Sequence, residues 1–393
     1  MRNTHETQRR KLFINTYKVI PLTPKVGVIQ WVDGTTTLAD YIFRGNNSAH
    51  KRYRGSKEED RGSKKEDWSY VGQRRVTALP LSRSAASLHA RMMLARALTQ
   101  RTLVHWWPRV FSALSLFPLF STCCCRYEEC MKKLKKKERD VNNREEDYLE
   151  VCEHFKPVFH HFFLERFTSP CTWFERRQAY TRSVAASSIA GHILGIGDRH
   201  CQNILIDERT AEVIHIDFGI VFEMGLELIT PERVPFRLTR DVVDGMGVCS
   251  VEGTFRRCCE ETMSVLRNNS EALMTILEVF VHSPLHTWTL TVEEAKKKQG
   301  DGSESSPNPD ANPHGAVTGG GAAGDDVESD DTTEKHWVKD ANRILERVRV
   351  KMKGQEDHSG EALSVAGHVA HLINVARDPA QLSRMYHGWA AFV

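Results

Sequence analysis

Apolar and polar residues alternate in a short stretch near the start of the chain. Residues 11–22 alternate well enough to predict a β-strand, with Pro21 near its end. Residues 28–32 predict a second short strand, which a turn at 33–34 closes. The two strands predict a hairpin, and residues 37–43 predict a helix after it.

Two apolar runs in the middle of the chain are separated by a polar turn. Residues 203–207 and 213–217 predict two short buried strands, and residues 207–212 predict the turn between them. Because the two strands form a hairpin, we expect Asn203 and Asp217 to lie at strand ends that face one cleft.

Helical spacing of apolar residues predicts most of the remaining ordered chain. The helix over residues 172–194 contains small residues at 185–188 that permit close packing, and Gly195 and Gly197 end it. Residues 296–333 are rich in Gly, Ser, Asp and Pro, a composition typical of disorder. Further helices are expected over residues 148–167, 251–281 and 337–352, and a helical pair broken at Asp378-Pro379 follows.

Composition narrows the class of protein. The 393 residues suffice for two domains, and the net charge of +3 implies no dominant polyelectrolyte partner. The 10 cysteines include adjacent runs and no spaced zinc framework, which favours reduced thiols. The polar first residues predict no signal peptide, and no direct nucleic-acid motif is expected. Pro108, Arg109 and Pro118 interrupt the apolar residues 103–120, so no membrane helix is expected.

The polar residues after the long predicted helix carry the candidate chemistry. Asp198 and Asn203 are five residues apart, and Asp217-Phe218-Gly219 follows fourteen residues later. Protein kinases use this order and spacing, with one Asp accepting the hydroxyl proton while the Asn and the second Asp hold Mg²⁺. Phosphoryl transfer needs positioning and charge neutralisation, which His200 and Arg199 can supply beside the phosphates. Either motif alone is also common as a plain turn, whereas the pair favours a kinase site.

The Asp-Arg-His order of residues 198–200 reverses the His-Arg-Asp of ordinary protein kinases. It resembles the phosphatidylinositol-3-kinase-related superfamily, which contains lipid kinases and very large protein kinases. The stretches that resemble its DNA-damage protein kinases are residues 173–192, 234–247, 251–259 and 363–393. The resemblance implies an α+β, protein-kinase-like fold of the PI3/PI4-kinase type, with a mostly helical large lobe, most of the small lobe missing, and a helical C-terminal FATC element.

The resemblance also implies the ligands and their residues. ATP and Mg²⁺ or Mn²⁺ are the expected cofactors. Asp198, His200 and Arg199 are the expected catalytic residues, and Asn203 and Asp217 the metal ligands. The expected nucleotide-binding residues are Gln30, Trp31 and Val32 of the hinge, with Leu205 and Ile216. The activation segment would run over residues 217–241 and include Phe218, Gly219, Pro235, Phe236 and Arg237.

The expected domain plan follows from these assignments. It comprises the end of the small lobe and hinge (1–44), a loop and atypical insert (45–129), the large lobe (130–296), a disordered linker (297–335), a helix (336–360) and the FATC domain (361–393). We expect the apolar residues of the FATC domain to pack on the large lobe near the activation segment.

Two stretches depart from the family pattern. The residues before Lys11 contain no glycine-rich phosphate loop and no strand lysine, both of which a kinase needs. The sequence therefore predicts the tail of a longer protein, or a truncated product with reduced or no activity. Residues 55–129 are the second departure: residues 55–67 are charged and predict a solvated loop, and residues 76–125 show no counterpart in the family.

Three functions are compatible with the sequence. The leading one is a nuclear serine/threonine protein kinase of the DNA-damage response that phosphorylates Ser/Thr-Gln sites. By resemblance it would be a homodimer in full-length form and would meet DNA-break sensor complexes. A phosphoinositide lipid kinase shares both motifs, but its activation segment is usually basic, whereas residues 220–234 carry three Glu and one Arg. The third is a catalytically inactive fragment or scaffold.

Overall fold

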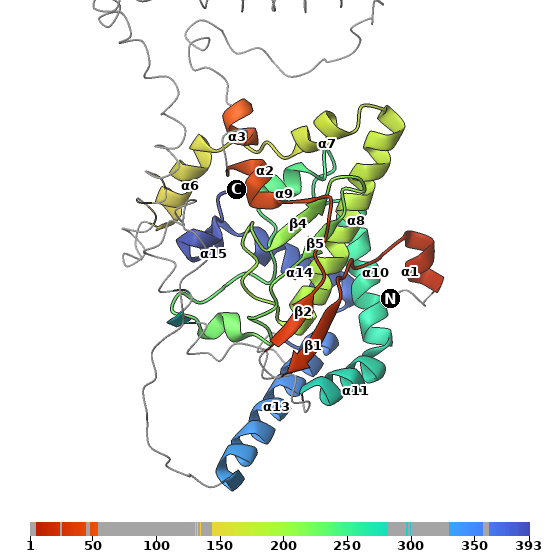
Figure 1. Cartoon of the computed structure of the whole chain (residues 1–393), viewed down its shortest axis with the longest axis vertical. Coiled ribbons are helices and arrows are strands. Elements are labelled where there is room, and N and C mark those ends of the chain that lie inside the picture. Colours follow the sequence, from red (N-terminus) through yellow and green to blue (C-terminus); the bar gives the residue numbers. More distant parts are fainter. Residues whose placement is uncertain are drawn as a thin grey trace, which may run out of the picture. The chain divides into compact units, whose positions relative to one another are not determined.

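The computed structural model describes residues 5–23, 26–44, 48–53, 130, 132, 134, 144–281, 296, 297, 299, 330–356 and 361–393 (Figure 1). The expected insert at 55–129 and most of the expected linker at 297–335 lie outside this set. None of the described helices is long and apolar enough to cross a bilayer.

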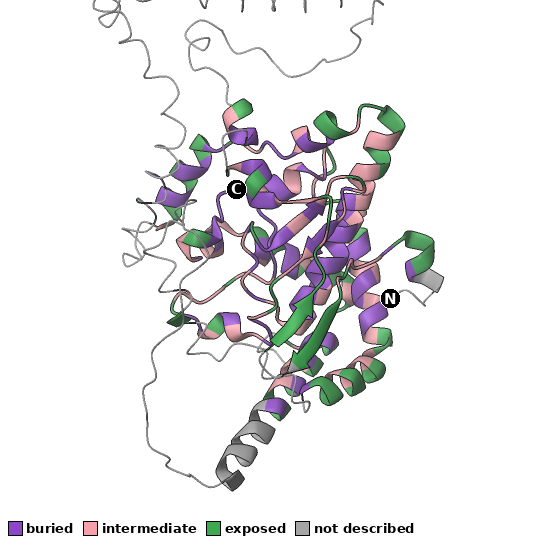
Figure 2. Cartoon of the chain, in the orientation of Figure 1, coloured by how far each residue is buried: buried purple, intermediate pink, exposed green. Residues whose placement is uncertain are grey.

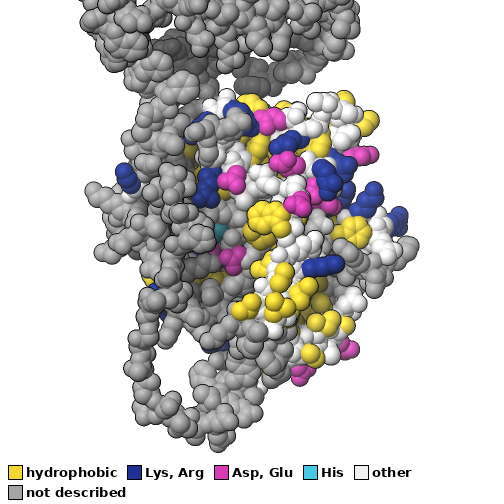
Figure 3. Space-filling model, in the orientation of Figure 1, with side chains coloured by type: hydrophobic (Ala, Val, Ile, Leu, Met, Phe, Trp, Pro, Cys, Tyr) yellow, Lys and Arg dark blue, Asp and Glu magenta, His cyan; other side chains and the backbone are white. Residues whose placement is uncertain are grey.

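A two-stranded antiparallel hairpin lies near the start of the chain. It is formed by β1 (Val19–Thr23) and β2 (Val26–Ile29), with Val19 opposite Ile29. The strand expected over residues 11–22 is shorter than predicted, because pairing to the second strand ends where the Gln30 amide donates to the Lys18 carbonyl at 2.8 Å. Before it come α1 (His5–Arg10) and a connection in which Leu12 is fully buried. Apolar side chains of the hairpin are exposed and form part of the yellow surface in Figure 3.

A second, three-stranded antiparallel sheet carries the polar motifs. Its order is β3 (Thr35–Thr37), β4 (Ile204–Asp207) and β5 (Val213–His215), so the hairpin predicted from residues 203–217 is confirmed. The Asp207 carboxylate accepts the Arg209 and Thr210 amides and shapes the turn. Alternation did not reveal β3, which is three threonines long.

The long helix α8 (Pro170–Leu194) runs beside this sheet and beside α10 (Thr254–Asn268) (Figure 1). Small side chains let the two helices approach closely, so that Ala185 and Cys259 are both fully buried. The Ser183 hydroxyl accepts the Val213 amide at 3.0 Å and ties the helix to β5. The part of α8 from Tyr180 onward and the β4–β5 pair are among the most buried parts of the described chain, whereas the first ten residues of α8 are exposed or half-buried (Figure 2).

Aromatic rings fill the core at the N-terminal half of α8. Phe159, Phe163 and Tyr180 have ring centroids 5.3–5.8 Å apart, and the Tyr180 hydroxyl donates to the Val242 carbonyl. Aromatic pairs at this spacing add stability beyond the area that they bury. The surrounding short helices are α2 (Leu38–Ile42), α3 (Ala49–Arg52), α6 (Arg144–His154), α7 (His160–Arg166) and α9 (Arg240–Asp244), with α11 (Ser270–Val281) following α10.

The C-terminal region forms α13 (Asp330–Lys353), α14 (Val365–Arg377), α15 (Pro379–Leu382) and a 3-10 turn, η3 (His387–Trp389). The first helix starts at Asp330, inside the linker expected over 297–335, because the acidic run at 330–334 suits a helix N-terminus. Asp378 ends α14 and caps α15 by accepting the Ala380 amide at 3.1 Å, as the Asp-Pro break predicted.

Candidate active site

Two backbone features, at Gly195 and Gly197, shape the start of the loop between α8 and β4. Gly195 ends the helix in the left-handed region at φ 60°, and the Gly197 amide donates to the Ile220 carbonyl at 2.9 Å. Asp198 is itself left-handed at φ 56°, an uncommon conformation for a residue with a side chain. Its amide donates to Glu232 Oε1 at 2.8 Å, which holds the strained residue in place.

Asp198 and Asn203 meet across the loop. Asn203 is buried, and its Nδ2 donates to the Asp198 carbonyl at 2.8 Å and lies 3.5 Å from Asp198 Oδ2. Because the amide nitrogen is engaged, the amide oxygen is left for a cation. The arrangement therefore puts a carboxylate and a hard oxygen donor side by side.

Asp217 joins them through the backbone. The Ile216 amide donates to the Asn203 carbonyl at 3.0 Å, so the end of β5 is registered against the start of β4. Asp217 is left-handed at φ 56°, and one of its carboxylate oxygens accepts the Gly219 amide at 3.2 Å. Its side chain is exposed.

Arg199 occupies a different place from the one expected beside the phosphates. Only 3% of the residue is exposed. Its Nε donates to the Gly197 carbonyl and its Nη1 to the Ile216 carbonyl, both at 2.7 Å, and its Nη2 donates to the Asp217 carbonyl. The guanidinium therefore fixes both site loops, because a planar group with five donors can bind several carbonyls at once.

His200 stays at the site. Its Nδ1 accepts the Gln202 amide at 3.2 Å, which leaves Nε2 to carry the ring proton, and Nε2 lies 3.8 Å from Asp198 Oδ1. The side chain is one quarter exposed, so it can offer that proton to a ligand beside Asp198.

Glu232 is a site residue that sequence reasoning missed. Besides accepting the Asp198 amide, its carboxylate fills the space that a Cβ would need at Gly197 and at Gly225, 2.7 and 2.6 Å away. Burial raises the pKa of Glu232 to about 7, partly offset by the hydrogen bond from the Asp198 backbone. The contact spans 34 residues, and no local pattern reports it.

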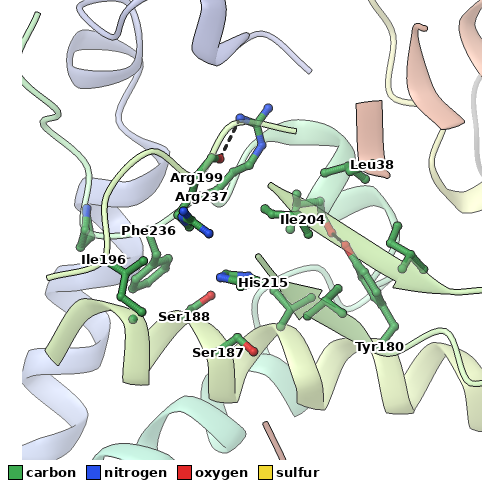
Figure 4. A pocket seen from close by; sticks show the side chains of 16 residues that line it. Leu38, Tyr180, Ser187, Ser188, Ile196, Arg199, Ile204, His215, Phe236 and Arg237 are labelled. Carbon is green, nitrogen blue, oxygen red and sulfur yellow. Dashed lines mark hydrogen bonds between the residues drawn. The ribbon is translucent and has the colours of Figure 1, made fainter. Parts of the chain in front are cut away.

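The activation segment joins the site to the C-terminal region. Phe218 is exposed, and its ring stacks on Tyr17 with centroids 6.3 Å apart. Phe236 is buried and, with Pro235, lines a small cavity beside Ser187 and Ser188 of α8 (Figure 4). Arg237 donates to the Arg199 carbonyl at 3.4 Å, the dashed contact in Figure 4. Burial lowers the pKa of His215, which lines the same cavity, to about 3, so its ring is neutral.

The residues expected to bind the nucleotide lie in two places. Leu205 is in the middle of β4, opposite Ile214, and Ile216 follows β5. Gln30, Trp31 and Val32 follow β2: the Gln30 side chain accepts the Lys18 amide at 3.0 Å, and Trp31 is 83% exposed. Contacts of Tyr17 with Phe218 and of Asn15 with Glu212 place the segment before β1 against the site.

This fold and this loop define the class of the protein. Residues 1–290 match the model of the phosphatidylinositol 3- and 4-kinase family, and residues 362–393 match the FATC domain. The chain therefore belongs to the phosphatidylinositol 3- and 4-kinase family, as the reversed motif predicted.

Within this family the chain is similar to particular protein kinases. It is 39% identical to the serine-protein kinase ATM of Sus scrofa, 40% to the serine/threonine-protein kinase ATM of Arabidopsis thaliana and 36% to the serine/threonine-protein kinase tel1 of Schizosaccharomyces pombe. All of the chain is covered, but only 10%, 8% and 11% of those proteins. The solved FAT and kinase domain of CtTel1 superposes with a TM-score of 0.67 at 30% identity, over 100% of this chain and 20% of that one.

Proposed function

We propose that this chain carries the phosphotransfer site of an ATP-dependent serine/threonine protein kinase. The observation that carries the proposal is the meeting of Asp198, Asn203 and Asp217 at one loop edge, with Asn203 hydrogen-bonded to Asp198 and Asp217 registered through Ile216. Three oxygen-bearing side chains without an activated nucleophile suit a reaction that needs positioning and charge neutralisation.

Each side chain has a task in this reaction. The Asp198 carboxylate orients the substrate hydroxyl and accepts its proton, and His200 Nε2 offers a donor beside it. The Asn203 amide oxygen and the Asp217 carboxylate fit Mg²⁺ or Mn²⁺, which neutralises phosphate charge when bound. Arg199 acts through the backbone, by fixing the carbonyls of Gly197, Ile216 and Asp217.

Charge in the activation segment supports a protein substrate over a phosphoinositide. A lipid kinase needs a basic cluster to meet the inositol phosphates. The described segment contains one exposed arginine, Arg233, while its glutamates are engaged by the protein. Glu223 pairs with Lys351 at 2.6 Å and Glu227 with Arg343 at 3.0 Å.

The finer parts of the proposal come from the family resemblance. We place the activity in the nucleus, in the response to DNA breaks, with Ser/Thr-Gln sites as substrates and break-sensor complexes as partners. Homodimerisation of the full-length protein is proposed because a solved relative is described as a complete CtTel1 dimer with C2 symmetry.

A chimaera tests the proposal, with residues 1–393 replacing the segment that they match in S. pombe tel1. We expect ATP-dependent phosphorylation of a Ser-Gln peptide, less of its Ser-Ala counterpart and none of phosphatidylinositol vesicles. Asp198→Asn should lower the rate about 10²–10⁴-fold, whereas Asp33→Asn, at an exposed position outside the site, should not. Lipid phosphorylation would favour the phosphoinositide kinase, and a folded chimaera without phosphotransfer would favour the scaffold.

A further inference from the structure

Three potential metal ligands from three segments meet at the C-terminal end of α8. His192 lies in the last turn of α8, Glu356 follows α13, and His368 lies in the first turn of α14. The Nε2 atoms of the two histidines lie 2.9 and 3.0 Å from the same oxygen, Glu356 Oε1. The three ligand atoms all lie within 4.8 Å of one another.

We infer that His192, Glu356 and His368 form a binding site for a divalent cation that favours imidazole, with Zn²⁺ as the first choice. Two imidazole nitrogens and one carboxylate oxygen are an established donor set for zinc, and Mg²⁺ prefers oxygen alone. Ligand atoms about 2.0–2.2 Å from a tetrahedral zinc lie roughly 3.3–3.5 Å apart. The observed separations of 2.9 and 3.0 Å therefore need to open by a few tenths of an ångström, while the two histidine nitrogens, which lie within 4.8 Å of one another, need to reach the same spacing.

Burial favours such a site. The side chains of His192 and His368 are 5% and 1% exposed, so their rings are held by packing, while Glu356 is 30% exposed. Glu356 and His192 line a cleft that His371 also borders. The three protein ligands thus leave a fourth position on the open side, where a water can complete a tetrahedron.

Two positively charged side chains, Lys351 and Arg267, lie next to the cluster, and their charge opposes the binding of a metal ion. Lys351 Nζ donates to the His192 carbonyl at 2.8 Å, but its charge is paired with Glu223. Arg267 Nη2 lies 2.9 Å from His368 Nδ1, while its Nη1 donates to the Leu363 carbonyl. Without a cation, Arg267 donates to Nδ1 and the ring donates from Nε2 to Glu356. Cation binding takes Nε2 of both rings. The proton of His368 moves to Nδ1, so Nη2 withdraws and Arg267 keeps its bond to Leu363, and the proton of His192 moves to its own Nδ1 or is released to solvent.

The position of the site gives the cation a structural effect. His192 precedes Gly195 in the helix that leads into the catalytic loop, whereas His368 belongs to the FATC match. A bound cation would join these two regions directly, and it would raise the stability of the folded chain because it binds that state preferentially.

Metal titration of the purified chain tests the inference. After chelator treatment and removal of the chelator, ZnCl₂ and CoCl₂ are titrated into the reduced protein, with MgCl₂ as a control ion. His192→Gln and His368→Gln keep an amide donor for Glu356 but remove the imidazole ligand. The matched control is His371→Gln. His371 is exposed, lies in α14 like His368, and is not one of the three cluster residues. Circular dichroism checks that each variant folds.

We expect the wild-type chain and the His371→Gln control to bind one Zn²⁺ at this site. In His192→Gln and His368→Gln, this binding should be lost, or its affinity should fall more than about 100-fold. Removal of a direct ligand should exceed the 10–100-fold effect of an outer-shell change. The 10 cysteines can also bind zinc, so cobalt spectra must show that the lost site lacks thiolate charge-transfer absorption. Equal stoichiometry and affinity in all folded variants, or no binding, would overturn the inference and leave the cluster as a hydrogen-bonded bridge.

Discussion

The Arg237 guanidinium lies 4.4 Å from the ring centroid of Trp389. It donates to the Trp389 carbonyl at 2.7 Å, to the Ala390 carbonyl at 2.8 Å and to the backbone oxygen of Val393 at 2.9 Å. One buried cation of the activation segment thus satisfies three acceptors of the FATC region. The structure confirms the expectation that the FATC region packs near this segment.

The first prediction is that Trp389→Ala lowers the free energy of unfolding by about 3–5 kcal/mol, because it empties a buried ring site. Since Arg237 loses its ring contact, hydrogen exchange over residues 217–241 should rise. Denaturant titration and exchange mass spectrometry measure both effects. Gln381→Ala, at a partly exposed position of α15, should change neither. If exchange over 217–241 is unchanged in Trp389→Ala, the FATC region does not hold the activation segment.

The second prediction separates the two aspartates in the tel1 chimaera. Asp217→Asn should weaken Mg-ATP binding and abolish turnover, because a proposed metal ligand loses its charge. Asp198→Asn should keep Mg-ATP affinity and lower kcat, because it removes the proposed proton acceptor. Calorimetry with Mg-ATP and steady-state kinetics give the two quantities. An equal loss of Mg-ATP affinity in both variants would show that the proposed roles are wrong.

The third prediction compares two glycines with positive φ. A Cβ at Gly195, at φ +60°, would lie 2.5 Å from the Glu223 backbone nitrogen, whereas a Cβ at Gly34, at φ +69°, would meet nothing within 4 Å. Both alanine variants carry the left-handed cost of about 1–2 kcal/mol. Only Gly195→Ala adds a backbone clash, so it should destabilise by about 1–3 kcal/mol more. Similar urea midpoints for the two variants would contradict this.

The fourth prediction concerns pH. Because burial raises the pKa of Glu232 to about 7, the folded protein holds this proton to a higher pH than the unfolded chain, where the value is near 4.5. The contribution of Glu232 to stability is therefore full below about pH 4.5 and is lost as pH rises towards 7, by at most about 3 kcal/mol. Glu232→Gln keeps an acceptor for the Asp198 amide and should flatten this slope in urea titrations between pH 4.5 and 7. A slope equal to wild type would exclude Glu232 as its source.

Local contacts account for what the sequence could predict. Asn203 and Asp217 flank one short hairpin, so their spacing was enough to bring them together. The helix break at Asp378 and the end of α8 at Gly195 could also be predicted from the sequence, because each depends on neighbouring residues.

Features that depend on long-range contacts could not be predicted from the sequence. Arg199 looked like a phosphate ligand because its neighbours match a catalytic motif, but two of the carbonyls to which it donates belong to residues after β5. The first strand was overestimated because alternation reports a pleated face and not the length of the partner strand. The register shows that the partner ends near Gln30.

The Arg237–Trp389 contact also has a consequence for protein synthesis. The two residues are 152 positions apart. At about 5–20 residues per second, a ribosome needs roughly 8–30 s to travel between them. During translation the activation segment therefore emerges well before the C-terminal residues are synthesised. Until then, Arg237 lacks the carbonyl acceptors of Trp389, Ala390 and Val393. The contacts of Arg237 are completed only when Trp389, Ala390 and Val393 have left the exit tunnel, so we expect them to form late, after the rest of the chain has been synthesised.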